Sequence, residues 1–328
     1  MVNWVQVANK QVVHRLARRA GLRRHAVDVD DAGTVMTIWV PKHKLPIADE
    51  EQRRKKSEQR GRSRLSVVLL HGFAGDGILT WVLQVGALAK KYDVYVPDLL
   101  FFGGSTSPAP GRSPAFQAEC VVAALRRLGV ERCAVVGFSY GGFVAFRMAE
   151  AHPALVRSVI ATGSLAAMSA STSAAMLRRL GAASWADVLL PDDVAGVKSL
   201  FAVGTHGKWW IPDCILKDYL DLFMFNRKDR AELLQGMVIS DKDAAVVPSF
   251  RQDILLLWGE GDKIFKMELA KSLKEQLGEK ATLRSISKAG HLAQLERPRV
   301  FNRCLREFLQ RGEVAGVYHD HVGQVKVV

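Results

Sequence analysis

An apolar segment that stops at a Gly-x-Ser-x-Gly motif constrains this chain more than any other feature. Residues 133–136 predict a short buried strand, and apolar residues at helical spacing begin at Phe143. The turn between them has to be tight, so glycine is expected at 137 and 141, where a Cβ would meet the strand or the helix. A bare motif of this kind is common, but this context predicts that Ser139 is presented as a nucleophile at the carboxyl edge of a sheet.

A serine hydroxyl attacks a carbonyl only with the help of a histidine and a carboxylate behind it. Residues 254–258 predict a buried strand that ends in an acidic turn holding Glu260 and Asp262. Residues 282–286 predict a second strand, followed by a loop with His291. Of the nine histidines, only His291 combines a strand, a Gly-His loop and a following helix downstream of that turn.

These three motifs, in the order serine, acid, histidine, resemble the α/β-hydrolase superfamily over about residues 65 to 311. The resemblance implies an α/β fold with a mostly parallel sheet flanked by helices and a helical cap insertion. The acid turn of that family typically has the pattern Gly-x-x-Asp, which favours Asp262 over Glu260 as the partner of His291. It also implies that the backbone amides of Phe73 and Tyr140 form an oxyanion hole. His71, inside the glycine-rich loop before the serine, is expected to be structural.

The alternation of strands and helices predicts the following organisation. We expect an amphipathic basic helix at residues 1–24, the first part of the core at 25–162, a charged loop within it at 42–64, a helical cap at 163–250, the second part of the core at 251–311 and a C-terminal tail at 312–328. Residues 25–30 and 34–40 predict an antiparallel hairpin.

The predicted cap is rich in methionine and aromatic residues and carries few central charges. Relatives usually have glycine where this chain has Phe101, which adds apolar bulk near the mouth of the site. Most of the aromatic residues must hold the cap together, but its composition also favours an apolar acyl or hydrocarbon group beneath it. The predicted substrate-binding residues are Phe101, Phe102, Trp209, Trp210 and Phe223.

The positive charge of the chain is concentrated near the N-terminus. Residues 1–65 hold 15 Lys and Arg against 7 Asp and Glu, so +8 of the net +13 lies there. The rest of the chain has no aromatic-basic stripe and no zinc spacing, which argues against a nucleic-acid partner. The helix predicted at 2–20 is basic and amphipathic. It is expected either to lie on a membrane surface or to pack on its own domain.

The scattered cysteines, Cys120, Cys133, Cys214 and Cys304, are expected to be reduced thiols, and the chain carries no Asn-x-Ser/Thr sequon. No leader with a cleavage site and no stretch of about 18 apolar residues is present. We therefore expect an intracellular, cytoplasmic protein, with peripheral membrane contact through the N-terminal helix left open.

The function predicted from these residues is hydrolysis of carboxylic esters with an apolar acyl chain, by an esterase or lipase that resembles the monoacylglycerol-lipase-like branch. Ser139, His291 and Asp262 would carry it, with water completing the reaction and no metal or organic cofactor required. Epoxide hydrolases and haloalkane dehalogenases resemble the chain less, because they have aspartate in place of Ser139. Two alternatives remain: a ligand receptor on the same scaffold, and a membrane-surface scaffold protein for which Ser139 is irrelevant. The oligomeric state is not predicted.

Overall fold

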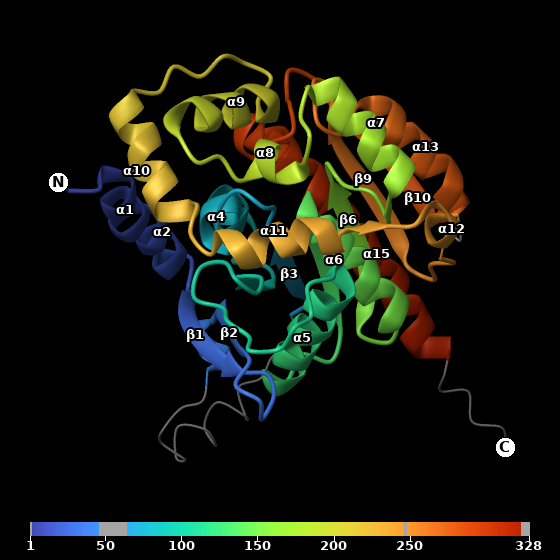
Figure 1. Cartoon of the computed structure of the whole chain (residues 1–328). Helices are drawn as coiled ribbons and strands as arrows, with labels where there is room; N and C mark the ends of the chain where they lie inside the picture. The colour runs from blue at the N-terminus through green and yellow to red at the C-terminus, as the bar shows by residue number, and fades with distance from the viewer. Residues whose placement is uncertain (1, 46–63, 246–247, 323–328) are drawn as a thin grey trace, which may run out of the picture.

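The structure is a computed structural model that describes residues 2–45, 64–245 and 248–322 (Figure 1). Most of the charged loop predicted at residues 42–64 lies outside these ranges. Its first residues form a short 3-10 helix, η2 (Lys42–Lys44). The four cysteines are free, as the sequence predicts, and three of them are buried.

One eight-stranded sheet forms the centre of the molecule, with the order β1-β2-β4-β3-β5-β6-β9-β10. Strands β1 (Leu22–Asp28) and β2 (Val35–Pro41) form the predicted antiparallel hairpin, and β2 pairs antiparallel with β4 (Asp93–Pro97). The remaining strands pair in parallel: β3 (Ser66–Leu70), β5 (Cys133–Phe138), β6 (Val156–Thr162), β9 (Asp253–Gly259) and β10 (Ala281–Ile286). The carboxyl ends of the parallel strands therefore meet along one edge, where ligands bind in open α/β sheets.

The two faces of the sheet are covered by different helices. Successive side chains of a strand point to opposite faces, so Val68 and Leu70 of β3 join one buried cluster while Val67 and Leu69 join the other. The first cluster includes residues of α5 (Pro114–Arg127), α6 (Tyr140–Ala151) and α13 (Met267–Leu277). The second includes residues of α4 (Gly77–Leu88) and α15 (Pro298–Val322). This three-layer arrangement is the predicted α/β class.

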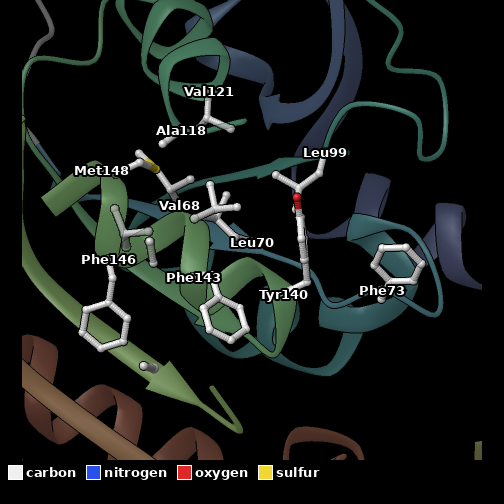
Figure 2. Close-up of a cluster of buried hydrophobic side chains, with 14 of the residues drawn as sticks. Val68, Leu70, Phe73, Leu99, Ala118, Val121, Tyr140, Phe143, Phe146 and Met148 are labelled. Carbon is white, nitrogen blue, oxygen red and sulfur yellow. The ribbon is translucent and has the colours of Figure 1, made fainter. Parts of the chain in front are cut away.

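The helix that follows Ser139 is anchored by its apolar residues. Figure 2 shows Phe143, Phe146 and Met148 of α6 in the same buried cluster as Val68 and Leu70 of β3. Burying an apolar side chain of this size stabilises the fold by about 1.5–3 kcal/mol. The first turn of α6, which carries Tyr140, is thereby held firmly against the end of the sheet.

The segment between β6 and β9 is a helical insertion, as predicted. It contains α7 (Ala170–Leu180), α8 (Trp185–Leu189), α9 (Val194–Gly204), α10 (Asp213–Phe223), α11 (Arg227–Gly236) and α12 (Asp241–Ala244), together with the short paired strands β7 (Met168–Ser169) and β8 (Val238–Ile239). Side chains at the N-caps begin several of these helices: Ser169, Ser184 and Asp193 each accept a hydrogen bond from a backbone N–H of the first turn.

The N-terminal segment is helical, as the sequence predicts. It consists of α1 (Trp4–Ala8), a π-helical turn η1 (Asn9–Val13) and α2 (His14–Arg19). The segment packs on the molecule, with α1 against α10 and α2 against α4, and Ala17 is fully buried. Figure 1 shows α1 beside α10, on the opposite side of the molecule from α13.

The C-terminal segment differs from the sequence expectation. Helix α15 continues to Val322, beyond Arg311, where the sequence analysis places the start of the tail. The residues that follow Arg311 include no proline, so nothing in the backbone chemistry obliges the helix to stop there. A short 3-10 turn, η3 (Gly278–Lys280), precedes β10, and α14 (Ala293–Glu296) precedes α15.

Candidate active site

Ser139 lies between the end of β5 and the start of α6, in the tight turn that the sequence predicts. Its backbone angles, φ 51° and ψ −119°, are rare for any residue with a Cβ. A Cβ on Gly137 would meet the backbone of Gly141, and one on Gly141 would meet the carbonyls of Leu70 and His71. The two glycines therefore allow strand and helix to approach closely enough to hold Ser139 in this strained conformation.

Asp262 and His291 form a buried pair after strands β9 and β10. Asp262 follows β9, and His291 lies in the loop between β10 and α14. The Oδ2 atom of Asp262 is 2.8 Å from Nδ1 of His291, and Oδ1 accepts hydrogen bonds from the amides of Ile264 and Phe265. Because a carboxylate accepts hydrogen bonds, it selects the tautomer with a proton on Nδ1 and leaves Nε2 free to take one.

The ring of His291 is also fixed by its neighbours. The ring of Phe265 stacks on it with centroids 5.7 Å apart, and the ring of Phe138 lies at 4.8 Å. On another side, Gly163 has φ 55°, and a Cβ there would meet Nδ1 of His291. The imidazole is thus held in one orientation by a carboxylate, two aromatic rings and a glycine.

Glu260, the other carboxylate of the acidic turn, has a different surrounding. It is exposed, and its Oε1 accepts a hydrogen bond of 2.8 Å from the hydroxyl of Ser285. The structure therefore brings Asp262, and not Glu260, to His291.

The loop after β3 and the first turn of α6 place Phe73 and Tyr140 close together. Their rings pack edge to face with centroids 5.7 Å apart, and Figure 2 shows both beside the buried cluster that α6 covers. Tyr140 is the first residue of α6, where backbone N–H groups and the helix dipole favour negative charge. The two residues whose amides are predicted to form an oxyanion hole are therefore neighbours, and the oxyanion hole itself stays a prediction.

His71 has a structural environment. It is fully buried, and its Nε2 accepts the N–H of Leu99 at 2.9 Å, so Nδ1 carries the proton and donates to the carbonyl of Gly72 at 2.6 Å. Burial lowers the pKa of His71 to about 4. The ring therefore stays neutral and ties the glycine-rich loop to the loop that follows β4.

Ser139 and His291 line the same cavity, whose volume is about 320 Å³. The insertion covers it, and among the described residues no Lys, Arg, Asp or Glu lines it. Apart from these two side chains and the backbone of the glycine-rich loop, the wall is mostly apolar: Val5, Phe73, Ala74, Leu79, Phe138, Leu189, Leu200, Phe201, Trp209, Ile211, Tyr219, Ile264, Leu292 and Leu295.

Of the five predicted substrate-binding residues, the structure places only Trp209 in this wall. Trp210 is 88% exposed. Phe223 is buried against Tyr219, with ring centroids 5.1 Å apart, and lies outside the lining of this cavity. Phe101 and Phe102 are buried too, but outside the cavity lining, in contacts with Arg112 of the core and Arg230 of the cap.

Arg230 of α11 explains the position of Phe101 and Phe102. Its guanidinium lies 4.2 Å from the centre of the Phe102 ring, and its Nε donates to the carbonyl of Phe101 at 3.1 Å. Arg112 covers the Phe101 ring in the same way, also at 4.2 Å. Burial lowers the pKa of Arg230 to about 10, which still leaves it charged at neutral pH. The two phenylalanines therefore anchor the cap to the core.

Most residues of the cavity wall were missed by the sequence analysis, and two of them, Val5 and Tyr219, come from helices that pack together. Val5 comes from the N-terminal helix, and Tyr219 from α10 donates its hydroxyl to the carbonyl of Ala74 at 2.7 Å. Tyr219 lies in the predicted cap, whose aromatic content was noticed, but nothing local distinguishes it from its neighbours. The position of Val5 depends on contacts between segments more than 200 residues apart.

Among the described side chains, no group of three or more His, Cys, Asp and Glu residues is placed to hold a metal ion. Within the same part of the chain, no helix combines the length and the apolar character that crossing a membrane requires.

Together, the parallel sheet, the strained serine turn and the order of serine, acid and histidine define a class of protein. The chain has the α/β-hydrolase fold, with a serine, an acid and a histidine in the chain order that serine hydrolases of this fold use. The family model for the alpha/beta hydrolase fold matches residues 66–194.

Known proteins that are similar to this chain have several activities. Epoxide hydrolase 3 of Xenopus tropicalis is 25% identical over 263 residues, which cover 74% of this chain and 71% of that protein. The 2-hydroxymuconate semialdehyde hydrolase of Pseudomonas sp. strain CF600 is 24% identical over 283 residues, covering 76% and 89%. The solved structure of a membrane phospholipase A, a bacterial virulence factor, matches with a TM-score of 0.73 at 21% identity, covering 94% of this chain and 91% of that one.

Proposed function

We propose that this protein hydrolyses carboxylic esters with an apolar acyl chain. The observation that carries the proposal is the cavity itself: Ser139 and His291 open into a space whose wall is almost entirely apolar. An apolar pocket with few convergent polar groups suits a hydrocarbon chain whose reactive carbonyl lies beside the polar groups. The glycerol esters hydrolysed by monoacylglycerol-lipase-like enzymes belong to this substrate class.

In the proposed mechanism, the Oγ atom of Ser139 attacks the ester carbonyl while Nε2 of His291 takes its proton. Asp262 keeps His291 in the required tautomer and stabilises the imidazolium that forms. The negative charge on the former carbonyl oxygen is stabilised by the amides of Phe73 and Tyr140. His291 then gives its proton to the leaving alkoxide, and water activated by the same histidine hydrolyses the acyl-enzyme.

The chemistry of Ser139 argues against epoxide opening as the main reaction. A serine that attacked an epoxide carbon would form an ether, which water activated by a histidine does not cleave. Attack on an ester carbonyl instead gives an acyl-enzyme, which water does cleave. An ester substrate therefore permits the complete cycle with the residues that this site holds.

The lining of the cavity also argues against a substrate with a free carboxylate, such as a muconate semialdehyde. No Lys or Arg lines the cavity among the described residues, so nothing there would offset the cost of removing a carboxylate from water. Neutral esters avoid that cost. Turnover of a panel of neutral and acidic esters tests this: we expect hydrolysis of neutral esters with medium or long acyl chains, and preference for the acidic members would contradict the proposal.

A ligand receptor on this scaffold is the main alternative, and turnover separates the two functions. An enzyme releases many product molecules per molecule of protein, whereas a receptor releases at most about one and then stops. A burst equal to the protein concentration with no steady phase, seen with every ester of the panel, would favour the receptor.

We also propose that the N-terminal helix contacts an anionic membrane that holds the lipid substrate. The helix packs on the core, yet it leaves Trp4 62% exposed and Val12 and Leu16 more than 40% exposed. The basic side chains Lys10, Arg15, Arg18 and Arg19 are exposed on the same segment. Each basic group near an anionic surface contributes about 1 kcal/mol to membrane binding.

Sedimentation with anionic and neutral vesicles tests the membrane contact. The double variant Arg15→Glu/Arg18→Glu should bind anionic vesicles less than the wild type does, and salt should weaken wild-type binding. Lys271→Glu/Lys274→Glu on α13, on the opposite side of the molecule, changes the net charge equally and serves as the control (Figure 1). Equal losses in both variants would mean that overall charge, rather than this helix, directs binding.

A further inference from the structure

The N-terminal helix forms part of the wall around the candidate active site. Val5 of α1 lines the cavity that holds Ser139 and His291, together with Leu79 of α4 and Tyr219 of α10. It is partly buried and packs against the main apolar cluster, whereas its neighbour Trp4 faces outward and is 62% exposed. One side of this short helix therefore faces the substrate space and another faces the solvent.

Specific hydrogen bonds to the cap hold α1 in this position. The Oδ2 atom of Asp218 accepts the backbone N–H of Trp4 at 2.6 Å, and the backbone carbonyl of Asp218 accepts a hydrogen bond from the side chain of Asn3 at 2.9 Å. A carboxylate at the first turn of a helix is favoured by the helix dipole and by the free N–H groups there. Together with the packing of α2 on α4, these contacts with α10 determine where Val5 lies.

We propose that Val5 is a specificity-determining residue, and that the N-terminal helix is the wall against which the far part of the acyl chain packs. The inference rests on the proposed ester hydrolysis. Valine is a small side chain at this position, and the other residues that line the cavity are mostly larger. Enlarging residue 5 removes space from the cavity, and reducing it adds space, without altering Ser139, Asp262 or His291.

The test uses p-nitrophenyl esters from two to sixteen carbons and compares kcat/KM for long esters with kcat/KM for short ones. Each buried methylene is worth about a four-fold difference in binding, so a wall moved inward by a few carbons changes this ratio strongly. We expect Val5→Phe to lower the long-to-short ratio by about ten-fold or more, and Val5→Ala to shift the preferred ester to a longer chain. The matched control is Val7→Phe, on the same helix but outside the cavity lining, and its ratio should equal that of the wild type.

Two results would overturn the inference. The first is a length profile for Val5→Phe that is the same as for the wild type and Val7→Phe. The second is an equal change of profile in Val5→Phe and Val7→Phe, which would assign the effect to a general disturbance of α1. If Val5→Phe does not fold, judged by circular dichroism, the profile of Val5→Ala decides in the same way.

A wild-type protein that is not an esterase gives a result that differs from both of these. If the wild type hydrolyses no ester of the series, ester hydrolysis is contradicted, and the wall is tested by displacement of a fluorescent fatty acid with unlabelled fatty acids of the same lengths. The affinity for long chains should then fall in Val5→Phe and stay unchanged in Val7→Phe. Equal affinities in all three proteins, or no fatty-acid binding by the wild type, would overturn the inference about Val5.

Discussion

Oδ2 of Asp262 lies 2.8 Å from Nδ1 of His291, while its other carboxylate oxygen accepts two backbone amides. The backbone of the acidic turn therefore fixes the carboxylate in place, independently of its contact with the imidazole. In the variant Asp262→Asn, the amide oxygen keeps the two backbone bonds, so the NH2 group faces Nδ1. That arrangement favours the tautomer with a proton on Nε2, which cannot accept the proton of Ser139.

We expect Asp262→Asn to lower kcat by about 10⁴ for this reason. Glu260→Gln is the matched control, because it changes a carboxylate of the same turn that bonds only to Ser285 in the structure described here. Its kcat should stay close to that of the wild type. A larger loss in Glu260→Gln than in Asp262→Asn, measured side by side on one ester, would reverse the assignment.

Ser139→Ala removes the attacking atom without adding bulk to the turn. We expect it to abolish labelling by a fluorophosphonate probe and to lower kcat by roughly 10³ to 10⁶, while the far-UV circular dichroism is unchanged. His291→Ala should be similarly damaging, because the serine then has no base. Labelling that persists in Ser139→Ala would place the nucleophile at another serine.

The strain at Ser139 leads to a separate prediction about stability. A residue with a Cβ in this backbone conformation costs on the order of 1–3 kcal/mol, and glycine avoids most of that cost. We expect Ser139→Gly to unfold at a higher temperature than Ser139→Ala, although both are inactive. Glycine also raises the entropy of the unfolded chain, by about 0.5–1 kcal/mol relative to alanine, so calorimetry measures the relief of strain minus this cost. A lower Tm for the glycine variant would mean that the strain at residue 139 is smaller than this entropic cost.

Tyr219→Phe tests whether the cap positions the loop that carries Phe73. The tyrosine hydroxyl donates to the carbonyl of Ala74, the residue next to Phe73, at 2.7 Å. Removing an oxyanion donor lowers the rate by about 10² to 10³. A donor that stays in the site but is displaced should lower kcat less, by about 10-fold. We expect kcat to fall while KM changes little, because the phenyl ring still fills the same part of the wall. A change confined to KM would indicate a role in substrate binding alone.

Local patterns predicted most of the fold and the relation of the three central residues. Ser139, Asp262 and His291 each follow a strand, and parallel strands bring their carboxyl ends to one edge, so their order along the chain was informative. The backbone geometry at Ser139 also follows from two glycines within the same turn. Each turn is determined by residues within a few positions of it, and the parallel sheet brings the three turns together.

The wall of the cavity could not be predicted in the same way, because contacts between distant segments determine it. Phe101 and Phe102 contact Arg230 and do not line the cavity. Arg230 lies more than 120 residues further along the chain. Trp209 and Trp210 are adjacent and chemically identical, yet one lines the cavity and the other faces solvent. Apolar composition indicated the kind of substrate space but not which side chains enclose it.

The buried, neutral His71 should make the stability of the protein depend on pH. Its pKa is about 4 in the folded protein and about 6.5 in the unfolded chain, so the unfolded state binds more protons between these values. The contribution to stability is therefore fully present above about pH 6.5 and is lost as the pH falls towards 4. The expected loss from this residue is about 3 kcal/mol.

His71→Gln should remove this part of the pH dependence, because glutamine does not titrate. Its side-chain oxygen offers an acceptor to the N–H of Leu99, although the donor to Gly72 is placed less well, so the variant should be less stable at pH 7. Urea unfolding at several pH values between 7 and 4.5 measures both effects. We expect the difference in the free energy of unfolding between the two proteins to narrow towards acid pH. Parallel curves across this range would show that His71 titrates in the folded state as it does in the unfolded chain.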